Sequence, residues 1–323
     1  MTDAERLKAM YRAMLTARRF DEAQIAFYKT GKVHMESVHS HIGQEAIGVG
    51  AGFAMRQGDM LVPSLRSRPA FFALGVPLNL QWAGVLSRET APGKGLIGSR
   101  HMTAHEYGIV GTTGIVGAHV PVATGVAMAQ KMDGKGAATV CLFGDGAANR
   151  GECHEGMNMA AVFKSPVVFI CEANGVAESQ HWESYMPIDD LSVRAAGYGM
   201  PGYRIDGNNV QQVHDTVAEA LARAREGGGP SFIVAETCRM HPHVEGLPDF
   251  RDAKFLDDWR ARDPIDAARR LFVETHSVSA ESLDAMNDEV ETLIDQAREE
   301  ALQMPLLDPA RLADLVFSAA KEH

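Results

Sequence analysis

Residues 137–174 constrain the fold of this chain more than any other stretch. They read AATVCLFGDGAANRGECHEGMNMAAVFKSPVVFICEAN, which is an apolar β-rich run, a Gly-Asp-Gly turn, a helix of about four turns and a second apolar β-rich run. Two such runs joined by a helix predict a βαβ unit, in which the strands are parallel. The sequence therefore predicts an α/β fold with a mostly parallel sheet flanked by helices, and helical extensions at both ends of the chain.

Polar residues follow both β-rich runs of this unit. Asp145 comes after the first run and Asn174 ends the second. Ligands bind at the carboxyl ends of parallel strands, because backbone N–H groups and the positive end of the following helix point outward there. A carboxylate and an amide oxygen on adjacent strand ends suit a hard cation that also holds a diphosphate, and Mg²⁺ is the natural candidate. The amides of Gly146 and Ala147, at the helix start, are then placed to bind phosphate oxygens.

The Gly-Asp-Gly turn and Asn174 together form the motif of thiamine-diphosphate enzymes, although Gly-Asp-Gly alone occurs in many ordinary turns. The stretch GDGAANRGECHEGMNMAAVFKSPVVFICEANGVA resembles one branch, the alpha subunit of the dehydrogenase component of 2-oxo acid dehydrogenase complexes, which include the pyruvate, branched-chain and acetoin enzymes. The resemblance extends over most of the chain. It implies a thiamine-diphosphate-binding fold of the diphosphate type, thiamine diphosphate and Mg²⁺ as cofactors, and Asp145, Asn174 and the backbone carbonyl of Val176 as metal ligands.

Further motifs of the same family lie outside the βαβ unit. His39 stands in its His-x-x-x-Gly-Gln-Glu-Ala signature, Gly114 and Val116 in its Gly-Ile-Val-Gly-Ala, and Arg239 and His243 in a loop similar to Thr-Tyr-Arg-Tyr-His-Gly-His. The resemblance implies that His39 lies beside the substrate's carboxylate, that the backbone at 114 and 116 binds the aminopyrimidine ring, and that Arg239 and His243 adjoin phosphate and substrate. Each feature also has a plainer interpretation: His39 as a structural histidine, the segment with Gly114 and Val116 as a generic glycine loop, and the segment with His243 as a polar loop. The family context favours a role in catalysis.

Segment 59–75 departs from the family pattern. In place of aromatic-Arg-x-His-Gly it carries Leu65, Arg66, Ser67, Arg68 and Pro69. Arg66 keeps the position that binds the diphosphate, a task that suits a guanidinium. The aromatic and the histidine are lost, and Val176 replaces a further ring. We therefore expect a preferred substrate other than pyruvate, with acetoin or a related hydroxyketone first and a branched or substituted 2-oxo acid second. Arg68 is expected to add a cation at the entrance for a distal carboxylate or phosphate.

The resemblance also implies partners. Thiamine-diphosphate chemistry needs a carboxylate against the pyrimidine ring, and this chain has no recognisable second half that supplies one. A beta subunit is therefore expected to complete the site in an α₂β₂ assembly. The predicted activity is cleavage of a small carbonyl substrate, a 2-oxo acid or acetoin-like hydroxyketone, with transfer of the acyl group to a lipoyl acyltransferase core. His39 and His243 would steer the substrate and move protons.

Two other functions are compatible with parts of the sequence. The first is a two-subunit thiamine-dependent lyase or transferase without lipoyl transfer, which the altered entrance allows. Neighbouring genes for a beta subunit and a lipoyl acyltransferase would separate it from the dehydrogenase. The second is a non-catalytic nucleotide-binding or regulatory subunit, against which the intact Arg66, Asp145, Asn174 and His243 argue.

The composition narrows the class of protein. A net charge of −11 argues against nucleic acid and anionic membranes as partners, and 46% hydrophobic residues provide for a buried core. The N-terminal residues lack a basic region followed by an apolar one, so a cytoplasmic location is expected. The cysteines are scattered, and we expect neither a disulfide nor a cysteine metal site. We expect one domain over 1–323, with a helical extension at 1–60, a cofactor-binding core at 61–240, and an active-site loop with C-terminal helices at 241–323.

Two segments outside the core have helical patterns. Thr2 with Glu5 forms a capping box ahead of an amphipathic run that ends near Tyr28. Val120–Met132 is apolar and alanine-rich, and we expect it to pack against the partner subunit.

Overall fold

A parallel β-sheet forms the centre of the protein. The computed structural model describes residues 2–32, 37–276 and 278–316. The five strands are β1 (Met60–Val62), β2 (Thr139–Gly144), β3 (Val167–Ala173), β6 (Gly202–Asp206) and β7 (Ser231–Glu236). Their order in the sheet is β1-β2-β3-β7-β6, and every neighbouring pair is parallel. The predicted α/β class is thus confirmed.

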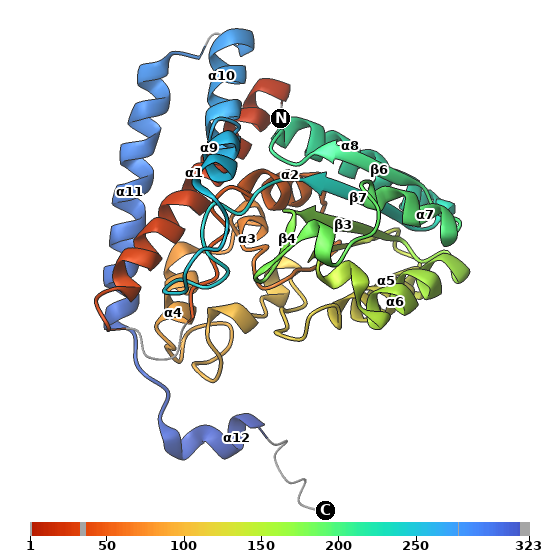
Figure 1. The fold of residues 1–323 in the computed structure, drawn as a ribbon. Helices are drawn as coiled ribbons and strands as arrows, with labels where there is room; N and C mark the ends of the chain where they lie inside the picture. The colour runs from red at the N-terminus through yellow and green to blue at the C-terminus, as the bar shows by residue number, and fades with distance from the viewer. Residues whose placement is uncertain (1, 33–36, 277, 317–323) are drawn as a thin grey trace, which may run out of the picture.

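Helices cover both faces of the sheet. Alternate strand residues point to opposite faces, so Val168 and Ile170 pack with α2 (Glu45–Ala54) and α8 (Val210–Arg223), while Phe169 and Cys171 pack with α5 (His119–Asp133) and α6 (Gly151–Val162). Figure 1 shows α8 on one side of the sheet and α5 with α6 on the other. The predicted βαβ unit is therefore β2-α6-β3, and its strands are buried on both faces, as their continuous apolar runs require.

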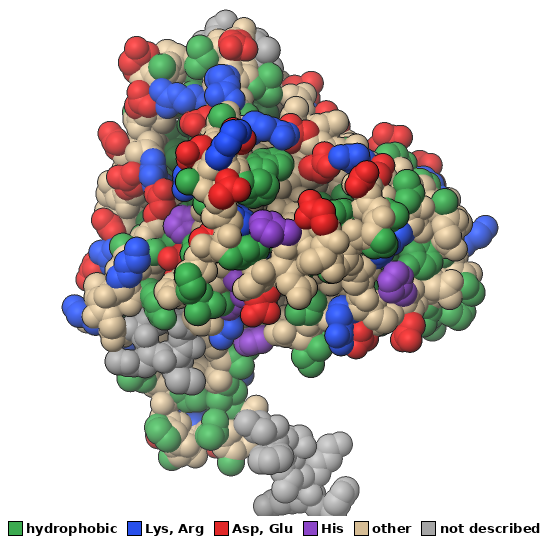
Figure 2. All heavy atoms as spheres, viewed as in Figure 1, with side chains coloured by type: hydrophobic (Ala, Val, Ile, Leu, Met, Phe, Trp, Pro, Cys, Tyr) green, Lys and Arg blue, Asp and Glu red, His purple; other side chains and the backbone are tan. Residues whose placement is uncertain are grey.

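Helices from the two ends of the chain form a separate layer beside the sheet (Figure 1). Helix α1 (Asp3–Tyr28) packs against α10 (Pro264–His276) and α11 (Ala280–Gln303) through a shared apolar cluster. The predicted capping box is present, since the Glu5 N–H donates to Thr2 Oγ1 and the Thr2 N–H to Glu5 Oε2. Figure 2 shows acidic and basic side chains interspersed over this layer, without one continuous basic surface on this face.

Shorter elements complete the structure. They are α3 (Pro69–Ala73), α4 (Leu78–Val85), β4 (Val176–Ala177), β5 (Gln180–His181), α7 (Arg194–Gly197), α9 (Ala253–Arg260) and α12 (Leu312–Val316). Among the described residues, no helix is both long and apolar enough to cross a membrane. The four cysteines are free and buried.

Two sequence-based expectations stay predictions. Helix α5 leaves Val122 half exposed and Met132 86% exposed, but no partner chain is present to test the predicted contact with another subunit. The domain boundaries at 60 and 240 are likewise untested, although α2 packs on the sheet while it lies within the predicted extension 1–60.

Candidate active site

A cavity of about 700 Å³ lies at the carboxyl ends of β2 and β3. Ten of the eleven residues predicted for the site line it: Arg66, Gly114, Val116, Asp145, Gly146, Ala147, Asn174, Val176, Arg239 and His243. The other, His39, is not among the lining residues but lies beside His243, with the two ring centroids 5.2 Å apart. Residues as far apart in the sequence as Arg66 and His243, 177 positions, thus meet at one end of the sheet, where the topology of an α/β fold places a ligand.

The tips of β2 and β3 are joined through the Asp145 carboxylate. Its Oδ1 accepts a hydrogen bond from the Gly146 N–H and its Oδ2 one from the Gly175 N–H, both at 2.8 Å. Gly175 has φ +77°, a conformation that favours glycine. Asp145 is 2% exposed, and this burial raises the pKa of its carboxyl to about 6 against the opposing effect of the two backbone donors. Asp145 forms no ion pair with another described residue, although the charge of Arg239 acts on it, and a bound cation would provide a direct counter-charge.

Asn174 and Val176 lie beside this carboxylate. Asn174 lines the cavity, and its Nδ2 donates to Gln44 Oε1 at 3.3 Å, which fixes the orientation of the amide and leaves Oδ1 as its acceptor end. That oxygen accepts the Val176 N–H at 3.2 Å and retains a second lone pair. Among the described residues there is no group of three or more His, Cys, Asp or Glu side chains around one point. A cation here would instead take one carboxylate, one amide oxygen and one backbone carbonyl.

Two buried arginines bring positive charge to the same cavity. Arg66 donates to the carbonyl oxygens of Ser40 at 2.5 Å and His243 at 3.0 Å. Arg239 donates from Nη2 to the Glu178 carbonyl at 3.3 Å, but its Nε and Nη1 are buried with no hydrogen-bond partner among the described residues. Burial lowers the pKa of Arg66 to about 9 and of Arg239 to about 10, so both remain charged at neutral pH. Buried, unpaired guanidinium donors are costly, and a phosphate group would satisfy them.

The two histidines adopt opposite tautomers. His39 Nδ1 lies 3.1 Å from the Ser37 carbonyl oxygen, which only accepts, so Nδ1 carries the proton and Nε2 has the lone pair. His243 Nδ1 lies 3.4 Å from Arg66 Nη2, which only donates, so here Nδ1 is the acceptor and Nε2 carries the proton. Burial and the nearby arginines lower the pKa of His39 to about 4 and that of His243 to about 3. At neutral pH the pair therefore offers one acceptor and one donor, both uncharged.

This pair gives a pH dependence of stability. The folded-state pKa of His243 is about 3, below the ordinary value of 6.5, so the unfolded chain binds more protons between these pH values. Stability from His243 is present above pH 6.5 and is lost as the pH falls toward 3. We expect the His243→Gln variant to lose less stability than the wild type between pH 7 and 4, measured by urea unfolding at each pH. Equal pH dependence in the two proteins would contradict the buried neutral state.

One prediction for the entrance is wrong. Arg68 does not line the cavity: it is 9% exposed, donates to Gln24 Oε1 at 2.5 Å and to Ser99 Oγ, and lies over the Phe20 ring. Since its guanidinium is occupied on the side of α1, it adds no cation for a distal anionic group of the substrate. Leu65, by contrast, lines the cavity as predicted for an entrance residue.

Three buried polar residues of the cavity were not predicted as site residues: Gln44, Glu172 and His119. Glu172 is next to last in the apolar strand β3, two positions before Asn174, and its charge was the only signal. His119 is 5% exposed, and its Nε2 donates to the Leu142 carbonyl at 3.0 Å.

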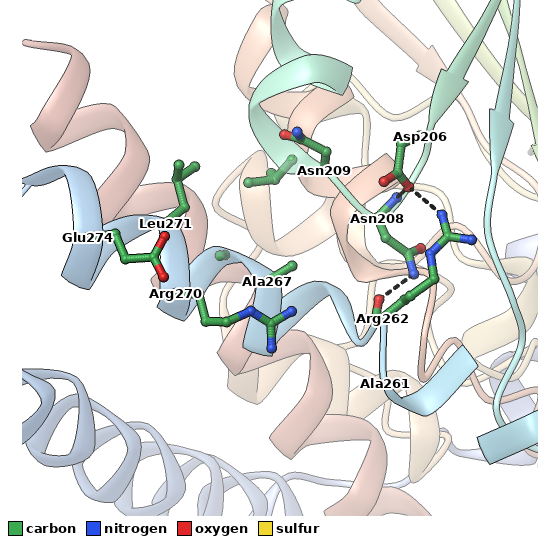
Figure 3. Close-up of a pocket in the computed structure, with 11 residues that line it drawn as sticks. Asp206, Asn208, Asn209, Ala261, Arg262, Ala267, Arg270, Leu271 and Glu274 are labelled. Carbon is green, nitrogen blue, oxygen red and sulfur yellow. Dashed lines mark hydrogen bonds and ion pairs between the residues drawn. The ribbon is translucent and has the colours of Figure 1, made fainter. Parts of the chain in front are cut away.

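A second cavity, of about 360 Å³, lies between the start of α8 and helix α10 (Figure 3). Its polar groups are largely paired with one another, since Asn208 Nδ2 donates to the Arg262 carbonyl at 2.7 Å and Asp206 lies 3.5 Å from the Arg262 guanidinium. It contains none of the predicted site residues. The candidate active site is therefore the larger cavity.

Known proteins resemble the chain over almost all of its length. The subunit alpha of acetoin:2,6-dichlorophenolindophenol oxidoreductase from Cupriavidus necator is 36% identical over 98% of this chain and 95% of its own length. The subunit alpha of 2-oxoisovalerate dehydrogenase from Bacillus subtilis is 34% identical over 98% and 97%. The subunit alpha of the pyruvate dehydrogenase E1 component from Rhizobium meliloti is 33% identical over 95% and 88%.

The family model of the dehydrogenase E1 component matches residues 11–310. This range includes every predicted site residue and the whole sheet. The chain belongs to the dehydrogenase E1 component family.

Proposed function

We propose that this chain is the alpha subunit of a dehydrogenase that uses thiamine diphosphate to cleave a small 2-oxo acid or an acetoin-like hydroxyketone. Membership of the family implies thiamine diphosphate. One observation carries the proposal. The same cavity contains the oxygen ligands of Asp145 and Asn174, the Arg66 guanidinium and the Arg239 donors that have no partner among the described residues. An oxygen site for a cation beside two buried guanidiniums is what a metal-bound diphosphate requires.

Each part of the cofactor has candidate residues. Mg²⁺ would be held by the Asp145 carboxylate, Asn174 Oδ1 and the Val176 carbonyl, and the diphosphate by Arg66, Arg239 and the amides of Gly146 and Ala147. The aminopyrimidine would lie against the backbone of Gly114 and Val116. A Cβ at Gly114 would lie 3.1 Å from His101 Cε1, so only glycine keeps the backbone open without moving that ring. When bound, thiamine diphosphate supplies the electron sink for cleavage beside the carbonyl carbon.

The two histidines serve the substrate. The Nε2–H of His243 would donate to the substrate's carbonyl or carboxylate oxygen, while Nε2 of His39 would accept a proton or hydrogen bond from a hydroxyl. Because the pKa values of both lie well below neutral, neither adds a charge that would repel the arginines. With opposite tautomers, the two histidines would orient one substrate through two groups: its carbonyl or carboxylate oxygen, bound by His243, and its hydroxyl, bound by His39.

The assembly completes the proposal. The relatives are named as alpha subunits, which implies a beta subunit as partner. We propose that the beta subunit covers the mouth of the cavity and provides the carboxylate that acts on the pyrimidine ring, in an α₂β₂ assembly. A lipoyl acyltransferase core as acyl acceptor, and a cytoplasmic location, are part of this proposal.

The lone chain tests this division of labour. Purified by itself it should be inactive and bind thiamine diphosphate weakly, because it has no recognisable half that supplies the carboxylate for the pyrimidine ring. Calorimetric titration in the presence of Mg²⁺, with and without a co-expressed beta subunit, measures the difference. Full turnover by the lone chain would contradict the proposal.

Substrate preference tests the entrance. Leu65 and Val176 give apolar walls, and Arg68 faces away, so an uncharged hydroxyketone suits the cavity better than a substrate with a distal anion. We expect the highest kcat/KM for acetoin in a dye-reduction screen of the reconstituted enzyme that also includes pyruvate, 2-oxobutanoate, branched 2-oxo acids and 2-oxoglutarate. Val176→Tyr should narrow the cavity and reduce kcat/KM for the larger substrates. A preference for pyruvate would overturn the entrance argument.

A further inference from the structure

A buried carboxylate faces the loop that carries Arg66. Glu172 is on β3, 2% exposed, and lines the cavity. Its Oε2 accepts hydrogen bonds from Ser67 Oγ at 2.6 Å and from Ser64 Oγ at 3.3 Å. The two hydroxyls also lie 2.7 Å from each other, so the Ser64 hydroxyl shares its one proton between Ser67 Oγ and Glu172 Oε2. One carboxylate oxygen thus binds both ends of the four-residue turn in which Arg66 lies.

The same serines hold the backbone of Arg66. The Arg66 N–H donates to Ser64 Oγ at 3.3 Å, and the Ser67 N–H donates to the Ser64 carbonyl at 3.2 Å. Ser67 is fully buried, so its hydroxyl has no access to water as a substitute partner. Neutralising the Glu172 carboxylate would weaken the hydrogen bonds that tie both serines to the sheet, because a hydrogen bond to a charged acceptor is roughly twice as strong as a neutral one.

The sheet leaves room for this contact. Gly144, which has no side chain, stands opposite Glu172 in the β2–β3 register, and β2 lies between β1 and β3 in the sheet. The turn after β1 therefore reaches across β2 to a side chain on β3. A carboxylate inside an otherwise apolar strand is costly to bury, which argues for a role in the site rather than in the core.

Charge gives Glu172 a second effect on Arg66. It makes no direct ion pair with the guanidinium, but it is one of two carboxylates, with Asp21, whose field favours the charged form of Arg66 against the repulsion from Arg239. Arg66 and Arg239 thus both stay charged and in place in the cavity before the diphosphate binds. Pre-placed donors bind an anion more tightly because less ordering occurs on binding.

We infer that Glu172 is a positioning residue, which acts through Ser64 and Ser67 to place Arg66 for the diphosphate of the cofactor. The inference rests on the proposed function, since it concerns the same bound group. It assigns Glu172 no contact with the reacting atoms.

The experiment compares thiamine-diphosphate affinity among variants of the assembled enzyme, by calorimetry at fixed Mg²⁺. Glu172→Gln should raise Kd about tenfold or more and Ser67→Ala by a smaller factor, while kcat at saturating cofactor stays within about twofold. Ser165→Ala is the matched control, because Ser165 is also a fully buried serine but lies before the other end of β3, outside the cavity. Its Kd should equal that of the wild type.

A double-mutant cycle identifies the route. In an Arg66→Gln background, Glu172→Gln should add little to the increase in Kd, because the residue through which it acts is already gone. Independent, additive losses would overturn the inference, and so would wild-type affinity in both Glu172→Gln and Ser67→Ala. If Glu172→Gln does not fold, the same comparison is made with Ser67→Ala and its double mutant with Arg66→Gln. Wild-type affinity in Ser67→Ala, or additive losses in the double mutant, would then overturn the inference. Absence of cofactor binding by the wild-type assembly would instead reject the proposed function.

Discussion

Replacing Asp145 with alanine is expected to abolish the Mg²⁺-dependent binding of thiamine diphosphate by the assembled enzyme while the fold stays intact. The substitution removes the only carboxylate among the proposed metal ligands, and the loss should exceed about 100-fold in affinity, since even second-shell partners of a metal contribute about 10- to 100-fold. The carboxylate also fixes Gly146 and Gly175, the residues at the two strand tips. No apolar contact of the sheet is lost, so the core should remain folded.

Calorimetry at fixed Mg²⁺ measures this loss, and circular dichroism with thermal unfolding checks the fold. Asp189→Ala is a suitable control, because Asp189 is an exposed aspartate that does not line the cavity. Unchanged cofactor affinity in Asp145→Ala would place the metal elsewhere.

A second large effect is expected at Arg239, with opposite signs for binding and stability. Arg239→Met should weaken cofactor binding by about 100-fold or more, in line with the loss of a charge-assisted phosphate contact of about 1.5–3 kcal/mol together with the loss of a buried cation. The free chain, however, should be as stable as the wild type or more stable. Two of its guanidinium nitrogens are buried without partners, and an apolar side chain of similar length removes that cost.

Arg251 provides the matched comparison. Its guanidinium is also buried, but it donates to the Arg239 and His241 carbonyl oxygens and to the Asp249 carboxylate. Arg251→Met should therefore destabilise the free chain, because it leaves these acceptors without donors. Thermal unfolding of the two variants without cofactor makes the comparison. If Arg239→Met were as destabilising as Arg251→Met, this would contradict the inference that Arg239 keeps its unpaired donors for the cofactor at a cost in stability.

The pattern of apolar runs was sufficient to predict the central unit. Continuous apolar runs around 140 and 170 are typical of strands buried on both faces, and the parallel connection then brings Asp145 and Asn174 to one edge. The predicted N-terminal helix and its capping box were confirmed for a similar reason, because a cap depends only on residues within one turn.

Side-chain direction set the limit of sequence analysis. Arg68 was expected at the entrance because it stands in place of the family's histidine there, but its backbone is helical (φ −57°, ψ −30°) at the start of α3, and its side chain packs on Phe20 of α1. Glu172 escaped notice because its partners lie more than 100 positions earlier in the chain. Neither contact follows from local periodicity, because both join elements that only the tertiary structure brings together.

The pairing of the first helix with the last ones bears on how the chain is made. Tyr11 of α1 packs against Phe272 of α10 with ring centroids 5.7 Å apart, and Arg12 forms an ion pair with Glu289 of α11 at 2.8 Å. At a synthesis rate of about 5–20 residues per second, roughly 13 to 55 s separate the two halves of this contact on the ribosome. Throughout that interval the apolar face of α1 has left the exit tunnel without its final cover. The nascent chain thus carries at its amino end a helix whose apolar face is covered only in part, by α2 and α4, until α10 and α11 have emerged.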